Sequence, residues 1–170
     1  QETNGAGGLF KGMRTIPVLL EIADEMQQLC PDAWLINFTN PAGMVTEALL
    51  RYGSHPKVIG VCNLPINTRM TLAKLLDVEV ERLHIDFAGL NHMVYGLDVL
   101  VDGESVLEDV LEIMSNPDKQ VSMRNIAPLP WEPEFIKSLG IIPCPYHRYF
   151  YKTSDILEKQ LEEFKTGTTR

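Results

Sequence analysis

Apolar residues follow a helical period in the first stretch of the chain and form short continuous runs in the next. Residues 9–30 place apolar side chains three and four positions apart, which predicts a helix of several turns. Residues 33–39 and 57–63 are apolar runs with the length of buried strands, and each precedes a helical pattern, over residues 42–53 and 64–78. Strand, helix, strand and helix in this order predict a parallel sheet with helical crossovers.

The pattern changes to longer strands in the second half of the chain. Two strand-like runs, His84–Gly89 and His92–Val101, precede a turn signal at Asp102-Gly103, and together they predict antiparallel strands. Residues 104–114 return to helical spacing. The chain is therefore predicted to be α/β in its first part and α+β in its second.

Prolines dominate the stretch that follows. Six of them lie within residues 115–145, which predicts mostly loop with a short helix near Glu134–Leu139. Residues 146–165 predict a final amphipathic helix, and the glycine-rich opening QETNGAGG predicts a loop. Because the chain opens on this segment and closes on TGTTR, we expect it to be a piece of a longer protein.

Composition and charge exclude several classes of protein. With 170 residues and 45% hydrophobic content, the chain can bury one substantial core. A net charge of −8 argues against a nucleic-acid-binding protein, which needs a basic surface. The chain has no run of about 18 apolar residues, so we expect no membrane span, and we expect no signal peptide. Three cysteines at irregular spacing favour a reducing compartment, the cytoplasm, over a disulfide framework.

Polar residues follow the predicted strands in three places. The three segments are Asn37–Pro41, Cys62–Pro65 and Asn91-His92. Because the carboxyl ends of parallel strands meet at one edge of a sheet, where ligands bind, polar groups at three such ends predict one shared cleft.

Each candidate residue has a structural interpretation beside the functional one. Cys62 and His92 lie 30 residues apart without a CxxC or HxxxH motif, which is a weak signal for a metal site. Cys62 can instead be a small apolar residue of the core, and His92 can be a structural histidine. Asn40 can cap the following helix or form an Asn-Pro turn instead of binding a ligand. The aromatic run around Tyr146 can be core packing, with Arg148 as a solvated or paired cation.

Five segments, taken together and in this order, resemble glycoside hydrolase family 4, the NAD- and metal-dependent glycosidases. The matching segments are QETNGAGG, INFTNPAG, VIGVCNLP, GLNH and PYHRYFY, and the resemblance runs nearly from end to end. Within VIGVCNLP, the Cys-Asn-x-Pro pattern resembles the 6-phospho-β-glucosidase branch of the family.

The resemblance implies a fold similar to the lactate and malate dehydrogenases. Residues 1–63 are then the C-terminal portion of a Rossmann-like NAD-binding domain, and residues 64–170 are part of an α/β domain that binds substrate and metal. The glycine-rich fingerprint that holds the pyrophosphate is absent from these residues, so we expect most of the NAD site upstream. The implied substrate is a phosphorylated disaccharide or an aryl-β-glucoside, and the implied assembly is a homo-oligomer.

The resemblance also implies an unusual hydrolysis of 6-phospho-β-glucosides, because NAD-dependent families do not use the two-carboxylate mechanism. The implied steps are oxidation at C3 of the sugar, deprotonation at C2, elimination of the group on C1, addition of water, and reduction at C3. Cys62 and His92 match the family's ligands for a divalent metal, Mn²⁺, although a thiolate and an imidazole are softer ligands than Mn²⁺ prefers. Tyr146 matches the base that deprotonates C2, and Tyr149 is the alternative.

Other positions match the family's binding residues. Asn40 matches an asparagine that binds substrate and cofactor. Glu2 is expected beside the cofactor, with Asn4 near it in the cleft, and Arg170 is expected to begin a segment that binds substrate or its phosphate. Asn63 stands where the phospho-α-glucosidases of the family carry an acid, so this match leaves the group that protonates the leaving group unassigned.

Two other functions stay open at this point. One is a metal-independent, NAD-dependent 2-hydroxy acid dehydrogenase of the related fold. The other is a non-catalytic assembly module, if these residues act alone, and we expect no activity from them by themselves. Metal dependence separates the glycosidase from the dehydrogenase.

Overall fold

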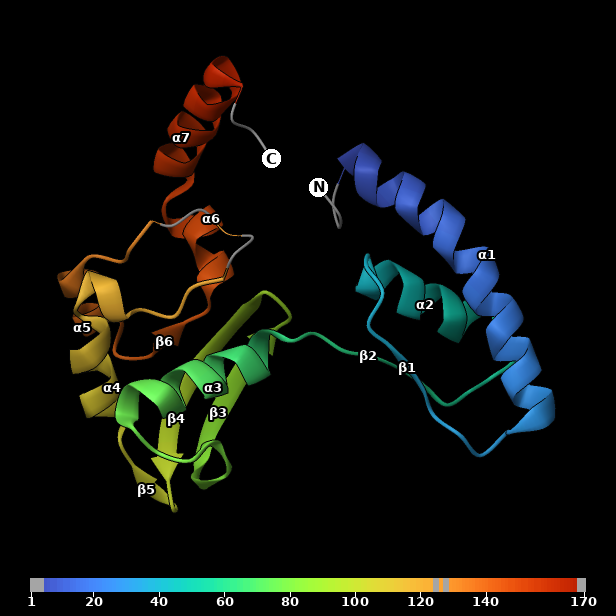
Figure 1. Cartoon of the computed structure of the whole chain (residues 1–170), viewed down its shortest axis with the longest axis horizontal. Coiled ribbons are helices and arrows are strands. Elements are labelled where there is room, and N and C mark those ends of the chain that lie inside the picture. The colour runs from blue at the N-terminus through green and yellow to red at the C-terminus, as the bar shows by residue number, and fades with distance from the viewer. Residues whose placement is uncertain (1–4, 124–125, 127–128, 168–170) are drawn as a thin grey trace. The chain divides into compact units, whose positions relative to one another are not determined.

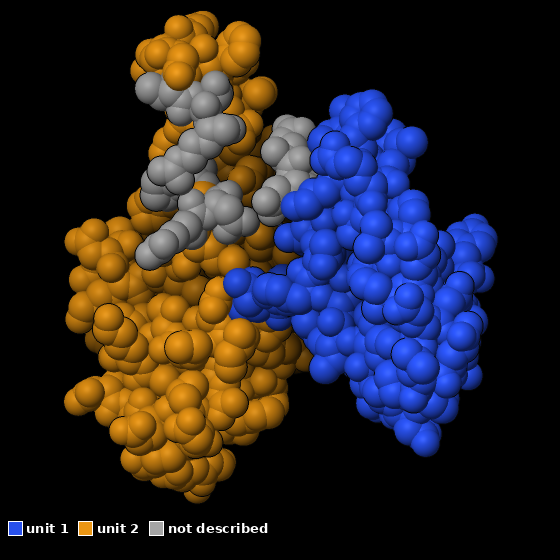
Figure 2. Space-filling model, turned by 45° about the vertical axis from the view of Figure 1, so that its right-hand side comes forward, with its two compact units in different colours: residues 1–63 blue, residues 64–170 orange. Residues whose placement is uncertain are grey.

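The computed structural model describes residues 5–123, 126 and 129–167 (Figure 1). The chain divides into two compact units, residues 1–63 and 64–170, which are coloured separately in Figure 2. The assignment of the first unit to NAD and of the second to substrate and metal stays a prediction. In the described part of the chain, no helix combines the length and the apolar character needed to cross a membrane.

The first unit consists of two helices and a small parallel sheet. Its elements are α1 (Gly5–Leu29), β1 (Leu35–Asn37), α2 (Ala42–Tyr52) and β2 (Val58–Gly60). Strands β1 and β2 pair in parallel, as the alternation of strands and helices predicts. Both helices bury apolar side chains against this pair, in a core formed by Ala23, Leu35, Val45, Leu49 and Val58.

The prediction of a loop for QETNGAGG is wrong for the residues of that segment that the structure describes. Helix α1 begins at Gly5, and Gly8 and Gly12 are buried within it. A Cβ atom on Gly12 would lie 2.6 Å from the Sδ atom of Met44 in α2, so the glycine allows the two helices to approach closely. The low helix propensity of glycine favours a loop, and the close packing at Gly12 is a tertiary contact that the local sequence does not reveal.

His55, to which the sequence assigned no role, joins α1 to the turn before β1. Its side chain is buried, with Nδ1 at 3.1 Å from Oε1 of Gln27 and Nε2 at 2.9 Å from the carbonyl oxygen of Ala33. This histidine therefore serves the fold of the first unit.

The second unit is built on a long antiparallel hairpin. Helix α3 (Leu64–Leu76) has Pro65 in its first turn, as predicted, and lies over strands β3 (Leu83–Leu90) and β4 (Met93–Val101) (Figure 1). The hairpin confirms the predicted antiparallel pairing. Two short strands, β5 (Glu104–Ser105) and β6 (Ile142–Pro143), add to β4.

The other elements of the second unit are helices. They are the 3₁₀ helices η1 (Val80–Arg82), η2 (Pro117–Lys119) and η3 (Pro145–His147) and the α-helices α4 (Leu107–Met114), α5 (Pro133–Leu139), α6 (Arg148–Tyr151) and α7 (Thr153–Thr166). Helix α5 agrees with the short helix predicted among the prolines. The core of this unit joins side chains from α3, the hairpin, α4 and α5 around Trp131.

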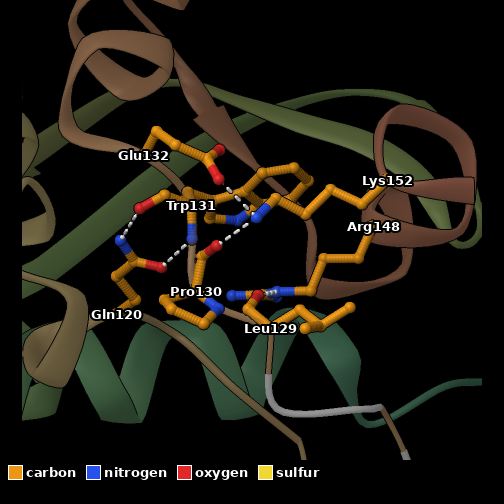
Figure 3. A network of polar contacts seen from close by, with 7 residues as sticks. All are labelled: Gln120, Leu129, Pro130, Trp131, Glu132, Arg148 and Lys152. Atoms are coloured by element: carbon orange, nitrogen blue, oxygen red, sulfur yellow. Dashed lines mark hydrogen bonds and ion pairs between the residues drawn. The ribbon is translucent and has the colours of Figure 1, made fainter. Parts of the chain in front are cut away.

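The prediction of one helix over residues 146–165 is wrong, because the segment breaks at Lys152 between α6 and α7. The ammonium group of Lys152 donates to the carbonyl oxygen of Pro130 at 2.6 Å and to Glu132 at 2.7 Å (Figure 3). These contacts fasten the chain at the break to a distant loop, which the helical periodicity does not reveal.

Of the two interpretations of Arg148, a solvated or a paired cation, the solvated one is wrong, because the side chain is buried. Its guanidinium donates to the carbonyl oxygen of Leu129 at 2.5 Å and lies 4.8 Å from the ring centroid of Trp131 (Figure 3). It also donates to the carbonyl oxygens of Pro145 and Val121, at 3.4 Å in each case. Burial lowers the pKa of Arg148 to about 10, which leaves the group charged at neutral pH. The side chain therefore acts as a cross-link between α6 and the proline-rich loop.

Arg148→Met is expected to lower the free energy of unfolding by about 3 kcal/mol, because it leaves buried carbonyl groups without their donor. The matched control is Arg51→Met on α2, which removes only an exposed i,i+4 pair with Glu47 and is expected to cost about 0.5 kcal/mol or less. Urea unfolding of both variants measures the difference. Equal losses from the two substitutions would contradict the cross-linking role.

Candidate functional site

Two of the three polar segments leave the same edge of the sheet in the first unit. Asn37, the last residue of β1, is in register with Gly60, the last residue of β2, and the amide of Val61 donates to the carbonyl oxygen of Asn37 at 3.0 Å. Asn40 and Cys62 follow these strand ends. Asn40 is exposed and Cys62 is half-buried. The structure thus brings Asn40 and Cys62 to one edge of the sheet, as predicted.

Asn37 organises the loop that carries Asn40. Its buried side chain donates to the carbonyl oxygen of Ala42 at 3.3 Å and to Oγ1 of Thr46 at 3.0 Å, and its Oδ1 accepts from the amide of Thr39 at 3.0 Å. The peptide bond between Asn40 and Pro41 is cis. The N-cap position of α2 is Pro41, so the interpretation of Asn40 as the helix cap is wrong. Its ligand role stays a prediction.

The third segment, Asn91-His92, is the tip of the β3–β4 hairpin. It is not the end of a parallel strand, so the argument from a shared sheet edge does not apply to it. His92 lies in the turn, not in β4, and takes a left-handed backbone conformation with a φ of 65°. Burial lowers the pKa of His92 below its ordinary value, which favours the neutral imidazole that binds metals.

The ring of His92 stacks on the ring of Tyr146. The two ring centroids are 3.7 Å apart, and the ring planes differ by 11°. The sequence separates these residues by a hairpin strand, two helices and a proline-rich loop, yet the fold of the second unit places the candidate metal ligand against the candidate base. This is the central geometrical feature of the candidate site.

Cys144 links the same two residues through hydrogen bonds. Its buried thiol donates to the carbonyl oxygen of His92 at 3.3 Å, and its sulfur accepts from the amide of Tyr146 at 3.3 Å. The amide of Cys144 in turn donates to Nδ1 of His147 at 3.1 Å, which completes a capping box at the start of η3. Burial raises the pKa of Cys144, so the group is a thiol and can donate.

The sequence interpretation missed Cys144 and His147. A signal was present, because Cys-Pro-Tyr-His has the spacing of a capping box, with the thiol and the imidazole in place of the hydroxyl and the carboxyl group. His147 is fully buried and stacks on Tyr95, with ring centroids 4.2 Å apart. Its Nδ1 accepts a hydrogen bond, so Nε2 carries the proton, and among the described residues that buried atom has no partner.

The buried His147 makes stability depend on pH. Burial lowers its pKa, so the unfolded state takes up a proton near pH 6.5 that the folded state resists, and unfolding becomes easier as the pH falls. The free energy of unfolding is expected to fall between about pH 7.5 and pH 5.5, with a slope from His147 of at most about 1.4 kcal/mol per pH unit. In His147→Gln this part of the slope is lost. Parallel pH profiles for the two proteins, measured by urea unfolding, would contradict it.

Tyr149, the alternative base, lies beside Tyr146 in the same aromatic segment. Its ring centroid lies 6.5 Å from that of Tyr146. Burial, and then the neighbouring Tyr146, raise the pKa of Tyr149, so it gives up its proton less readily than an ordinary tyrosine. A raised pKa opposes the formation of a phenolate at Tyr149, and the assignment of the base to Tyr146, with Tyr149 as the alternative, stays a prediction.

The chemistry of the donor set fits a divalent transition metal. Cys62 is a half-buried thiol and His92 a half-buried imidazole, and both are ligand types for such ions. Cys62 belongs to the first unit and His92 to the second. Within the residues that the structure describes, no three His, Cys, Asp or Glu side chains gather as a metal-binding cluster. Glu2, Asn4 and Arg170 lie outside the described residues, and their roles stay predictions.

Both parts of the chain are similar to known protein families. Residues 1–78 match the model of "Family 4 glycosyl hydrolase", and residues 87–170 match the model of "Family 4 glycosyl hydrolase C-terminal domain". The chain belongs to glycosyl hydrolase family 4. The resemblance drawn from the five segments is thereby confirmed, and the two family 4 models together span nearly the whole chain.

Individual family 4 proteins are similar over the full chain. A "Probable 6-phospho-beta-glucosidase" of Bacillus subtilis is 61% identical over 170 residues, and a 6-phospho-beta-glucosidase of Escherichia coli is 46% identical over 172 residues. Both alignments cover 100% of this chain and 38% of the relative, so the chain spans well under half the length of these curated relatives.

A solved family 4 structure shares the fold. The 6-phospho-beta glucosidase of Thermotoga maritima, solved with manganese, NAD+ and glucose-6-phosphate, matches with a TM-score of 0.72 and 33% identity. The match covers 100% of this chain and 38% of that chain. The predicted α/β fold is therefore confirmed.

Proposed function

We propose that the full-length protein containing this chain is a 6-phospho-β-glucosidase that works with NAD and a divalent metal, Mn²⁺. The observation that carries the proposal is the stacking of His92 on Tyr146, with ring centroids 3.7 Å apart. It sets a candidate metal ligand beside a candidate base, as a metal-assisted deprotonation requires. Support comes from the names of the two relatives and from the manganese, NAD+ and glucose-6-phosphate in the Thermotoga structure.

When bound, NAD supplies reversible hydride transfer at C3 of the sugar, and Mn²⁺ supplies Lewis acidity at the sugar oxygens. Cys62 and His92 would hold the metal through a sulfur and an imidazole nitrogen. Tyr146 removes the proton from C2, which a ketone at C3 makes acidic, and the electron pair left on C2 expels the group on C1. The phenol proton then exchanges with solvent, and Tyr146 donates a solvent-derived proton to C2 as water adds at C1.

Tyr146 needs a neighbouring positive charge to serve as a base near neutral pH, because an ordinary phenol holds its proton there. Because His92 stacks on Tyr146, a metal ion held by His92 would supply that positive charge beside the phenol. Asn40, exposed at the sheet edge in the first unit, is proposed to bind substrate and cofactor through its amide. Glu2 and Arg170 are proposed to contribute to the cofactor site and the substrate site.

The preference for β-glycosides with a 6-phosphate follows from the two relatives' names and from Asn63. This residue stands in the Cys-Asn-x-Pro pattern, where an amide cannot protonate a leaving group. We also infer a homo-oligomer in the cytoplasm. The cytoplasmic location is supported by Cys30, Cys62 and Cys144, which are all described and form no disulfide.

Metal removal tests the proposal. The full-length enzyme is expected to cleave an aryl-β-glucoside 6-phosphate in the presence of NAD and Mn²⁺, to lose this activity after exhaustive chelation, and to regain it when Mn²⁺ is restored. The unphosphorylated aryl-β-glucoside is the control and is expected to react poorly. Activity that survives chelation would favour a metal-independent enzyme and overturn the proposal.

A further inference from the structure

We propose that Cys144 is a positioning residue whose thiol couples the backbone of His92 to that of Tyr146, so that the metal ligand and the base keep their stacked arrangement. The inference rests on the proposed function and extends it to a residue that touches neither substrate nor metal in the proposed mechanism. Three features of the second unit carry it: the backbone at the hairpin tip, the two bonds of the sulfur atom, and the anchoring of the segment that holds Cys144.

The first feature is the conformation of His92. A φ of 65° lies in the left-handed region, which residues other than glycine adopt rarely and at a cost. Gly89, with a φ of 124°, precedes the turn in a conformation that favours glycine, and a Cβ atom there would overlap the carbonyl oxygen of Met93. A hairpin tip of this kind keeps one conformation only where its surroundings hold it.

The second feature is the position of the sulfur atom between the two functional residues. The thiol donates to the carbonyl oxygen of His92, and the sulfur accepts from the amide of Tyr146, at 3.3 Å in each case. Each bond is weak by itself. Together they connect the two backbones from which the stacked rings project, because one thiol takes part in both bonds.

The third feature is that Cys144 itself is anchored. The two residues before it form β6, which pairs with β4 at Gly96 and Tyr95. Strand β4 begins directly after His92. The amide of Cys144 donates to the buried ring of His147. The segment that carries the thiol is therefore held by the sheet before Cys144 and by the capping box after it. Through its bond to the carbonyl oxygen of His92, the thiol can restrain the hairpin tip.

The test uses the full-length enzyme and substitutions of Cys144 that change bonding separately from volume. Cys144→Ala removes both hydrogen bonds, Cys144→Val removes them while filling the space, and Cys144→Ser keeps a donor and an acceptor. Cys30→Ala is the control, because Cys30 is exposed in the first unit. Mn²⁺ affinity is measured by electron paramagnetic resonance of the free ion, and exchange of the substrate's C2 proton with solvent is measured by NMR.

Cys144→Ala and Cys144→Val are expected to weaken Mn²⁺ binding about tenfold and to slow C2 proton exchange by a similar factor, as loss of a residue that orients a metal ligand does. Cys144→Ser is expected to recover most of both losses, and Cys30→Ala to match the wild type. If the alanine variant does not fold, the valine variant takes its place.

Two results would overturn the inference while leaving the proposed function intact. One is wild-type affinity and exchange in the folded alanine or valine variant, even if its melting temperature falls. The other is a serine variant no better than alanine in both measurements. A wild-type enzyme that binds no Mn²⁺ and exchanges no C2 proton would instead overturn the proposed function itself, so the two failures are distinguishable.

Discussion

Cys62→Ser is expected to weaken Mn²⁺ binding to the full-length enzyme at least about 100-fold and to abolish cleavage of an aryl-β-glucoside 6-phosphate. Loss of a residue that only orients a ligand costs 10- to 100-fold in affinity, so loss of a ligand lies at or beyond the upper end of that range. A serine hydroxyl stays neutral where a thiolate would bind the ion. Equilibrium dialysis against Mn²⁺ measures the affinity.

His92→Ala is expected to weaken Mn²⁺ binding as much as Cys62→Ser, because both residues are proposed to bind the same ion. Cys30→Ser is the matched control, since Cys30 is an exposed cysteine at the end of α1 and is expected to leave affinity unchanged. Wild-type affinity in either Cys62→Ser or His92→Ala would remove that residue from the metal site.

Tyr146→Phe is expected to slow exchange of the C2 proton by about 10²- to 10⁴-fold, the usual contribution of a general base. Phenylalanine keeps the aromatic ring that stacks on His92, so Mn²⁺ affinity and the oxidation at C3 are expected to persist. Single-turnover formation of NADH reports the oxidation, and NMR in deuterated water reports the exchange. The two readouts separate loss of the base from loss of the site.

Tyr149→Phe is the matched control for Tyr146→Phe. It removes a phenol from the same aromatic segment, and the raised pKa of Tyr149 opposes a role as the base. Its exchange rate is expected to stay within about threefold of the wild type. A large loss in Tyr149→Phe with normal exchange in Tyr146→Phe would move the base to Tyr149.

Local patterns in the sequence were sufficient for most of the elements. Helical spacing predicted α2, α3 and α5, and two runs of strand residues predicted the antiparallel hairpin. The alternation of strand and helix predicted the parallel pair β1 and β2, which brings Asn40 and Cys62 to one edge. These features depend on neighbouring residues, so the sequence carries their signal directly.

Features that depend on distant contacts were not predicted. Gly12 of α1 allows a close approach to Met44 of α2, and the last helical segment breaks where Lys152 contacts the loop at Pro130. Arginine usually lies at the surface, but Arg148 is buried, and its guanidinium donates to a carbonyl group of that same loop. Periodicity describes which face of a helix is apolar, and it does not identify the chain segment that will bind a particular side chain.

The candidate site shows the same division. Family resemblance singled out His92 and Tyr146 separately, but their stacking and the hydrogen bonds through Cys144 arise only when the hairpin tip meets η3. The capping-box spacing of Cys144 and His147 was the one local signal for this arrangement, and it is easily missed because cysteine and histidine seldom fill those positions.

The glycosidic bond is proposed to break by deprotonation at C2 and elimination, with Tyr146 as the base. The most direct test is to let the full-length enzyme hydrolyse an aryl-β-glucoside 6-phosphate in deuterated water, with NAD and Mn²⁺, and to examine the glucose 6-phosphate formed by NMR and mass spectrometry. Deuterium at C2 of the product is the predicted result. Complete hydrolysis with hydrogen retained at C2 would contradict the account.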